Sequence, residues 1–388
     1  MIGNRNRTRS LPTFIFLALI ASLIAGCGPS KQALGAVDYT PLAGDDWAIS
    51  TPGDEGLDPL LVSRLYLNAA DLETLYGLIV VKNGRLIAEA YFNGGAIDQK
   101  TYLASATKSI TSALVGVARD RGCISSLDQK MIEFFPEYAN QLTDPRKAQV
   151  TIRDLLQMRS GYAWEERTPP YMEAFFSSRG YWLPFLKEFP ITSNPGTEFG
   201  YSNLSSHLLG AIVARACNTD LKSFGQEYLF SPIGAEAGEW SQDADGYYYG
   251  AHGLTLTARD RAKFGMVFLN DGEFEGRQII SADWVDDSLQ RYSENINFSG
   301  WIPGLTSRLG YFSDLGYGYQ WWSAKAGEHY FYYAAGHGGN YVILLEELDM
   351  IIVTSADRLY GNFGADAWEK EKAIIEVVGK FINSLPSE

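Results

Sequence analysis

Histidine and cysteine are both scarce in this chain, which has four histidines and three cysteines among 388 residues. None of the histidines falls in a His-Glu-x-x-His arrangement or in another spacing typical of metal ligands. We therefore expect neither a metal site nor a cofactor. Export of the chain would permit a disulfide between Cys123 and Cys217, but each lies near the end of an apolar helical run. We predict two buried thiols at these positions.

Positive charge is also under-represented, because 32 Lys and Arg stand against 46 Asp and Glu, which gives a formal net charge of −14. Nucleic-acid binding requires a basic surface for the phosphates, so this balance argues against it. The composition is otherwise that of a globular protein, with 46% hydrophobic and 20% charged residues. The chain is long enough for a large core, in one big domain or in two closely associated ones.

One long apolar run, LPTFIFLALIASLIAG, lies near the N-terminus and follows three arginines. It is too short for a comfortable membrane span, so a secretory signal peptide explains it best. The run ends in Leu23-Ile24-Ala25-Gly26-Cys27, which resembles the bacterial lipobox and implies lipidation of Cys27. The alternatives are an uncleaved anchor, or a plain signal peptide with an incidental cysteine.

These features predict a lipoprotein signal peptide over residues 1–26 and a tether over residues 27–56, where Gly, Pro and Asp occur without periodicity. The mature protein would be exported and anchored to the membrane through Cys27. It would face the periplasm or the cell exterior.

The spacing of apolar residues predicts a helix from Asp58, followed by two strands that flank Lys82-Asn83-Gly84. A mainly helical stretch extends from about residue 105 to 265. Strands return over residues 329–357, and a last helix covers residues 365–385.

This order of elements predicts an α+β fold, an α/β sandwich in which the two ends of the chain form one antiparallel sheet covered by helices. A second, mainly helical lobe at about residues 120–260 would leave a cleft beside the sheet. One domain over residues 57–388 would contain both lobes.

Ser105 and Lys108 are separated by two residues and precede a run of small and apolar residues, whose helix should be buried on most sides. The two side chains would lie on one face, with Ser105 at the helix N-terminus, where free N–H groups favour negative charge. Burial lowers the pKa of a lysine and makes it a potential base for an activated serine. The alternative is a Ser105 N-cap with Lys108 extended into solvent.

Tyr201-Ser202-Asn203 stands at the start of a second apolar helical run. A tyrosine beside a lysine ammonium can lose its proton more readily and act as a general base. The Asn203 amide could hold Lys108 or a substrate carbonyl. The alternative is local, with Asn203 as a helix cap and Tyr201 in the packing. Ser202 is a poor nucleophile candidate because its surroundings are not Gly-x-Ser-x-Gly.

Three glycines, Gly336, Gly338 and Gly339, stand at the start of a strand that is otherwise rich in Val, Ile and Leu. Glycines in a strand often mark the close approach of a ligand. His337 would face that ligand, or else only brace the strand. A backbone N–H of this stretch and that of Ser105 would form an oxyanion hole.

These motifs, in this order, resemble those of the penicillin-recognising serine hydrolases. The likeness is greatest to the class C β-lactamase-like branch, which includes D-alanyl-D-alanine carboxypeptidases, esterases and 6-aminohexanoate-dimer hydrolase. Further segments that resemble this branch are residues 150–164, 253–265 and 316–322. The likeness covers about residues 55 to 385.

The resemblance implies a role for each matching position. Ser105 would be the acylated nucleophile, and Lys108 and Tyr201 would share the proton transfers, with the choice of base left open. Asn203 would position these groups. The backbone N–H groups of Ser105 and Asn340 would form the oxyanion hole.

The third motif departs from the β-lactamase pattern, because His337-Gly338-Gly339 replaces the usual Lys-Thr-Gly. A histidine is mostly neutral at pH 7 and the threonine hydroxyl is absent, so a substrate carboxylate is less favoured. We therefore expect a serine hydrolase that cleaves an ester or amide of a small-molecule or short peptide-like substrate. The alternatives are a peptidoglycan D,D-peptidase or weak β-lactamase, and a non-catalytic ligand-binding relative.

The stretch from Tyr162 to Leu186 is dense in aromatic residues. It is either a wall of the substrate pocket or part of the core of the helical lobe, since large aromatic side chains are usually buried for packing. Tyr162 and Trp164 are the candidates for the pocket wall. For His252 we expect a role in loop packing.

Overall fold

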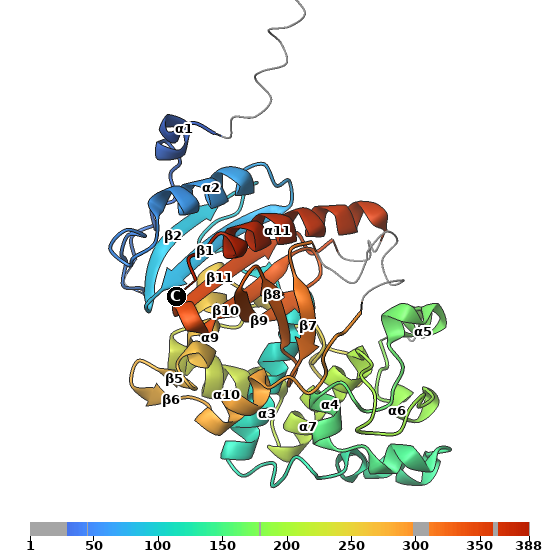
Figure 1. The fold of residues 1–388 in the computed structure, drawn as a ribbon. Coiled ribbons are helices and arrows are strands. Elements are labelled where there is room, and N and C mark those ends of the chain that lie inside the picture. The colour runs from blue at the N-terminus through green and yellow to red at the C-terminus, as the bar shows by residue number, and fades with distance from the viewer. Residues whose placement is uncertain (1–28, 45, 178–179, 298–309, 360–363, 388) are drawn as a thin grey trace, which may run out of the picture.

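The computed structural model describes residues 29–44, 46–177, 180–297, 310–359 and 364–387 (Figure 1). Its centre is a seven-stranded antiparallel sheet with the order β2-β1-β11-β10-β9-β8-β7. The strands are β1 (Leu75–Lys82), β2 (Arg85–Tyr91), β7 (Ser313–Tyr317), β8 (Trp322–Ala326), β9 (His329–Gly336), β10 (Asn340–Leu345) and β11 (Met350–Ala356). β1 pairs with β11, so the two ends of the chain share one sheet, which confirms the predicted fold class.

Helices cover both faces of this sheet, and the central strands β10 and β11 are therefore buried along their whole length. In Figure 1, α2 (Pro59–Ala69) and the C-terminal α11 (Ala365–Asn383) lie above the sheet, whereas α3 (Thr107–Asp120) and α9 (Ala258–Leu269) lie below it. The α2 and α11 helices also contact each other. The predicted first and last helices are thus confirmed.

The helical lobe lies below the sheet, beyond α3 (Figure 1). Its helices are α4 (Ile152–Leu156), α5 (Pro169–Ser177), α6 (Phe185–Glu188), α7 (Asn203–Ala216), α8 (Leu221–Gly225) and α10 (Ala282–Leu289). Short strand pairs add β3 (Thr101–Tyr102) with β4 (Thr255–Leu256), and β5 (Glu273–Phe274) with β6 (Arg277–Gln278). The α3 and α7 helices pack against each other, so their N-termini can share one site.

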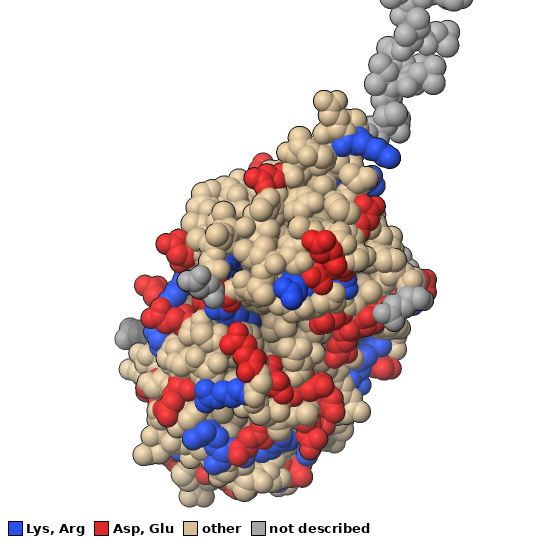
Figure 2. All heavy atoms as spheres, turned by 90° about the vertical axis from the view of Figure 1, so that its left-hand side faces the viewer, with Lys and Arg blue, Asp and Glu red and all other residues tan. Residues whose placement is uncertain are grey.

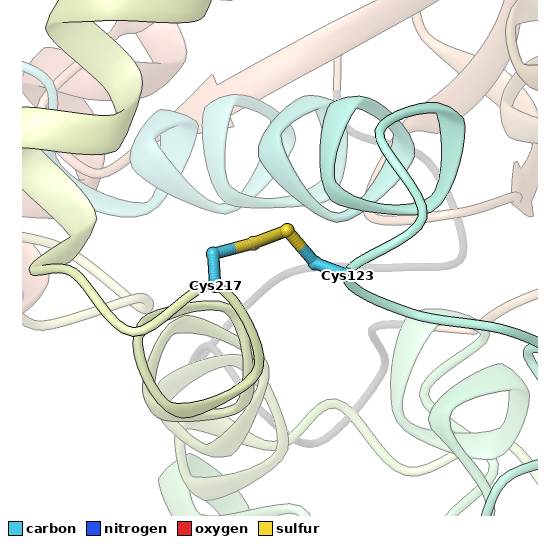
Figure 3. The surroundings of a disulfide bond; sticks show 2 residues. All are labelled: Cys123 and Cys217. Atoms are coloured by element: carbon cyan, nitrogen blue, oxygen red, sulfur yellow. A yellow bond between two sulfur atoms is a disulfide. The ribbon is translucent and has the colours of Figure 1, made fainter.

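The two cysteines of the folded domain form a disulfide, and the prediction of two free thiols is wrong. Figure 3 shows Cys123 just after α3 and Cys217 at the end of α7. Their Cα atoms are 5.1 Å apart, although 94 residues separate them in the sequence. Contact between α3 and α7 brings their C-terminal ends together, at a separation typical of disulfides.

The segment before α2 is more ordered than the predicted tether. It begins with the short helix α1 (Lys31–Gly35), and the backbone of Ile49 pairs with Leu86 of β2. The N–H of Leu42 donates to Glu89 at 2.9 Å, and Glu89 in turn binds Arg259 of α9 at 2.7 Å. This buried ion pair fixes the segment on the sheet.

The predicted signal peptide and Cys27 lie outside the described residues. Within the described part, no helix is both long and apolar enough to cross a membrane. On the face that Figure 2 shows, acidic and basic side chains are interspersed.

Candidate active site

Ser105 lies in a single 3₁₀ turn, Ala104–Ala106, which leads directly into α3. Ala104 has a φ of +49°, in the left-handed region that costs a non-glycine residue about 1–2 kcal/mol. Such strain is found at functional sites, where the surrounding structure holds it. Ser105 remains partly exposed, whereas the next turn of the helix is buried.

Lys108 is 1% exposed, and its ammonium group is surrounded by acceptors. Its Nζ donates to Ser105 Oγ at 2.9 Å, to Asn203 Oδ1 at 2.8 Å and to the carbonyl of Ala251 at 3.0 Å. Burial lowers the pKa of Lys108 to about 8, against the opposing charges of Glu166 and Glu165. A substantial fraction of Lys108 is therefore neutral in mildly alkaline solution, and it can accept a proton from Ser105.

Tyr201 and Asn203 stand on either side of the α7 N-cap, Ser202, whose Oγ accepts from the N–H of Ser205 at 3.0 Å. The Tyr201 ring centroid is 4.8 Å from Lys108 Nζ. Burial raises the pKa of Tyr201 above its ordinary value, and the nearby charge of Glu166 raises it further. Ser202, rather than Asn203, is thus the helix cap, and Asn203 is available to hold Lys108.

Two adjacent glutamates, Glu165 and Glu166, support this arrangement. Glu165 is fully buried and accepts from Ser202 Oγ at 2.7 Å, and from the N–H groups of Asn203 at 3.0 Å and Leu204 at 3.3 Å. Burial raises its pKa to about 7. The three hydrogen bonds to Glu165 anchor the N-terminus of α7, where the helix dipole favours negative charge.

Glu166 is half-buried and points to the same group of residues. Its Oε1 accepts from Asn203 Nδ2 at 3.2 Å, and its Oε2 accepts from Trp164 Nε1 at 3.1 Å. Asn203 thus bridges Glu166 and Lys108. Neither glutamate was predicted from the sequence, because an acidic pair in an aromatic-rich stretch has no diagnostic spacing. The only sequence feature that pointed to Glu165 and Glu166 was their position directly after Trp164, a candidate for the pocket wall.

His337 lies in the turn between β9 and β10 and lines both cavities that Ser105 lines. Its Nδ1 is 2.8 Å from Glu371 Oε2, and its ring centroid is 4.8 Å from that of Trp368, both on α11. Gly336 allows the end of β9 to lie close to the segment that leads to Ser105, because a Cβ on Gly336 would lie 2.0 Å from the carbonyl oxygen of Leu103. No sequence pattern distinguishes Glu371, since α11 resembles an ordinary amphipathic surface helix.

The other predicted members of the third motif, Gly338, Gly339 and Asn340, line neither of the cavities that Ser105 lines. The N–H of Gly338 donates to Glu371 at 3.0 Å, and that of Gly339 donates to the carbonyl of Gly336 at 3.2 Å. Asn340 is 1% exposed, begins β10 opposite Gly336, and accepts from Arg261 at 3.0 Å. It lies among structural contacts and does not line a cavity with Ser105.

Two cavities meet at Ser105. The first has a volume of about 350 Å³ and the second about 290 Å³. Both are lined by Ser105, Glu166, Met172 and His337. Tyr201 lines only the first cavity, and Asn203 lines only the second. A substrate whose reacting carbonyl lies at Ser105 would extend into both.

Of the remaining candidates, Trp164 and His252 each line a cavity, and Tyr162 does not. Trp164 lines the first cavity, whereas Tyr162 is buried and donates to the carbonyl of Leu186 at 2.8 Å. His252 lines the second cavity, with its Nδ1 3.1 Å from Tyr102 Oη. Burial lowers the pKa of His252 to about 3, so this side chain is neutral at physiological pH. Its position in a cavity wall differs from the predicted loop packing.

Comparison with known proteins shows the family and the fold of the chain. The Beta-lactamase family model matches residues 74–375. The 6-aminohexanoate-dimer hydrolase of Paenarthrobacter ureafaciens is 28% identical over 253 residues, which make up 63% of each chain. The chain thus matches less than two thirds of the length of this curated relative.

Solved structures show the same fold. A structure described as a putative 6-aminohexanoate-dimer hydrolase from Bacillus anthracis has a TM-score of 0.65 at 22% identity, and covers 90% of this chain and 91% of its own. EstCE1, described as a hydrolase with promiscuous acyltransferase activity, has a TM-score of 0.62 at 15% identity, and covers 81% of this chain and 98% of its own. The family match spans most of the chain, and the chain therefore belongs to the Beta-lactamase family.

Proposed function

We propose that this protein is a serine hydrolase that cleaves an ester or amide bond through an acyl-enzyme on Ser105. The observation that carries the proposal is the 2.9 Å contact between Ser105 Oγ and the buried Lys108, at the junction of two cavities. The relatives named as hydrolases support the reaction class.

In the proposed reaction, Ser105 Oγ attacks the substrate carbonyl carbon while Lys108, in its neutral form, takes the hydroxyl proton. The bond to the leaving group then breaks, and the leaving atom receives a proton by way of Tyr201. A water molecule attacks the acyl carbon, transfers a proton to the same pair of groups and releases the acid and Ser105. Glu165 and Asn203 hold Tyr201 and Lys108 in place throughout.

The developing oxyanion requires two donors near Ser105. We propose the backbone N–H of Ser105 and one from the end of β9. Ala335, Gly336 and His337 at that end line the first cavity with Ser105, and Asn340 does not. This assignment replaces Asn340 as the second donor.

A substrate panel tests the proposed reaction class. Wild-type protein would be assayed with p-nitrophenyl esters, short amides, D-Ala-D-Ala peptides and nitrocefin. We expect turnover of esters or amides well above that of nitrocefin and the peptides. Stable acylation by penicillin would favour a D,D-peptidase, and rapid nitrocefin turnover would favour a β-lactamase. A wild-type protein that binds these compounds without reacting would be a non-catalytic relative.

The pH dependence identifies the base. If neutral Lys108 takes the proton, kcat/KM rises with pH to a plateau, with a midpoint near the pKa of about 8. The charge of Glu166 raises that pKa, so Glu166→Gln should move the midpoint to lower pH. If Tyr201 is the base, the rate should instead keep rising above pH 10, because burial raises its pKa. Initial rates between pH 6 and 10.5 distinguish these results.

Glu165→Gln is expected to lower kcat about 10- to 100-fold with little change in KM. Glu165 lines neither cavity but accepts hydrogen bonds from Ser202, Asn203 and Leu204 through both of its oxygens, and a Gln side chain keeps only one acceptor oxygen. Glu173→Gln, at an exposed position of α5, makes the same chemical change and should leave both constants unaltered. A rise in KM alone would contradict the positioning role.

We further propose that the protein is exported and anchored through a lipid on Cys27. The disulfide between Cys123 and Cys217 supports an oxidising compartment. Cys27→Ser should release the protein from membranes into the soluble fraction, as followed by immunoblotting of fractionated cells. Protein that stays in the membrane fraction after this change would exclude lipidation as the anchor.

A further inference from the structure

The first cavity is the place where the leaving group must lie, if the proposed function holds. The leaving atom needs a proton from a group that faces it. Lys108 is 1% exposed and lines neither cavity, whereas Tyr201 lines the first cavity alone. Tyr201 is thus the proton-transfer group that can contact the leaving atom. The acyl group then occupies the second cavity.

The walls of the first cavity are mainly aromatic rings. They include Trp164, Tyr201, Trp322, Tyr333, Tyr341 and Trp368. Rings of this kind present a negative face that attracts cations, with the strongest effect for tryptophan. Trp164 already has such a contact, because the exposed Arg167 guanidinium lies 3.8 Å from its ring centroid. The lining is therefore suited to a ligand that is both apolar and positively charged.

The charged side chains in this wall are both acidic. Among the described lining residues they are Glu166 and Glu371, and no Lys or Arg is among them. Glu166 is held by the neutral donors Asn203 Nδ2 and Trp164 Nε1. Glu371 accepts from Tyr341 Oη at 2.8 Å and from the N–H of Gly338 at 3.0 Å, and its Oε2 lies 2.8 Å from Nδ1 of His337, a residue that is mostly neutral at pH 7. Hydrogen bonds from neutral groups stabilise a carboxylate without cancelling its charge.

We infer that the first cavity selects a leaving group that carries a cation, such as an alcohol with a quaternary ammonium group, and disfavours one that carries a carboxylate. This inference rests on the proposed function and adds a substrate class to it. A cation there would gain from the aromatic faces and from both carboxylates, whereas an anion would meet two like charges. Penicillins and D-Ala-D-Ala peptides carry a carboxylate on the leaving side, so this cavity also disfavours them.

Three butyrate esters with the same acyl group test the inference. They are butyrylcholine, its uncharged isostere 3,3-dimethylbutyl butyrate, and the anionic 4-butyryloxybutanoate, with acid release followed in a pH-stat at pH 8. We expect kcat/KM for butyrylcholine to exceed that for the neutral ester by about tenfold, and the anionic ester to be the slowest. A choline ester no faster than its isostere, or an anionic ester as fast as the neutral one, would overturn the inference.

Charge-removing variants locate the effect. Glu371→Gln should reduce the ratio of cationic to neutral ester about fivefold, whatever its effect on the absolute rates. Glu376→Gln makes the same change at an exposed position of the same helix and should preserve the ratio. Equal ratios in wild type and Glu371→Gln would contradict the role of this wall.

Two further measurements separate the inference from the function on which it rests. Hydrolysis of p-nitrophenyl butyrate shows that the serine chemistry operates; its absence, with no turnover of the three esters, would reject both. Inhibition of that hydrolysis by choline should be stronger than by 3,3-dimethylbutanol. Equal inhibition by the two alcohols would reject the cation preference while the hydrolase assignment stands.

Discussion

Ser105→Ala is expected to lower kcat/KM for an ester substrate by at least about 10³-fold, without a loss of fold. The change removes the oxygen that would form the acyl bond, and no other residue can replace it. Ser202, the N-cap of the neighbouring helix α7, is fully buried and its hydroxyl donates to Glu165. Initial rates with p-nitrophenyl butyrate, together with a thermal melt of each protein, measure both quantities.

Ser112→Ala is the matched control for this prediction. Ser112 lies on the same helix, is fully buried, and its hydroxyl has no hydrogen-bond partner among the described residues. Loss of this hydroxyl should leave the rate within about twofold of wild type. If Ser105→Ala retained more than a tenth of the wild-type rate, the nucleophile would have to be another group.

Lys108→Met is expected to reduce kcat/KM by about 10²- to 10⁴-fold, the range that general acid–base catalysis contributes. Methionine occupies a similar volume but cannot accept the proton of Ser105. The change also leaves Asn203 Oδ1 and the carbonyl of Ala251 without the ammonium group that binds them. Some loss of stability is therefore expected, and rates should be compared below the melting temperature of the variant.

A second buried lysine provides the control for that loss of stability. Lys147 is also 1% exposed, and its Nζ donates to the carbonyl of Lys187, away from both cavities. Lys147→Met should lower the melting temperature but preserve kcat/KM at permissive temperature. Equal losses of activity in the two variants would show that Lys108 acts only through stability.

The sequence located those parts of the site that are continuous in the chain. Ser105 and Lys108 lie one helical turn apart, and Tyr201 and Asn203 flank a helix start, so short motifs were enough to predict them. The antiparallel sheet was also predictable, because β1 and β2 flank an Asn-Gly turn and β9 to β11 follow one another closely. Local pattern and turn chemistry agree at these positions.

Other parts of the fold and of the candidate site depend on contacts between segments that are far apart in the sequence, and sequence patterns did not predict them. The disulfide follows from the packing of α3 on α7, and nothing near Cys123 or Cys217 indicates it. Glu371 reaches His337 only because α11 packs over the sheet, as Figure 1 shows. The family resemblance implied Asn340 as an oxyanion donor, and the structure places Asn340 at the start of β10, paired with Gly336 of β9.

Labelling of the active-site serine tests whether Ser105 is the acylated nucleophile. Wild-type protein and Ser105→Ala would be treated with a fluorophosphonate probe, and each would be digested and sequenced by mass spectrometry. The account predicts one adduct per wild-type molecule, on the peptide that contains Ser105, and none in the variant. An unlabelled wild-type protein, or equal labelling of Ser105→Ala, would contradict the proposal that Ser105 is the acylated nucleophile.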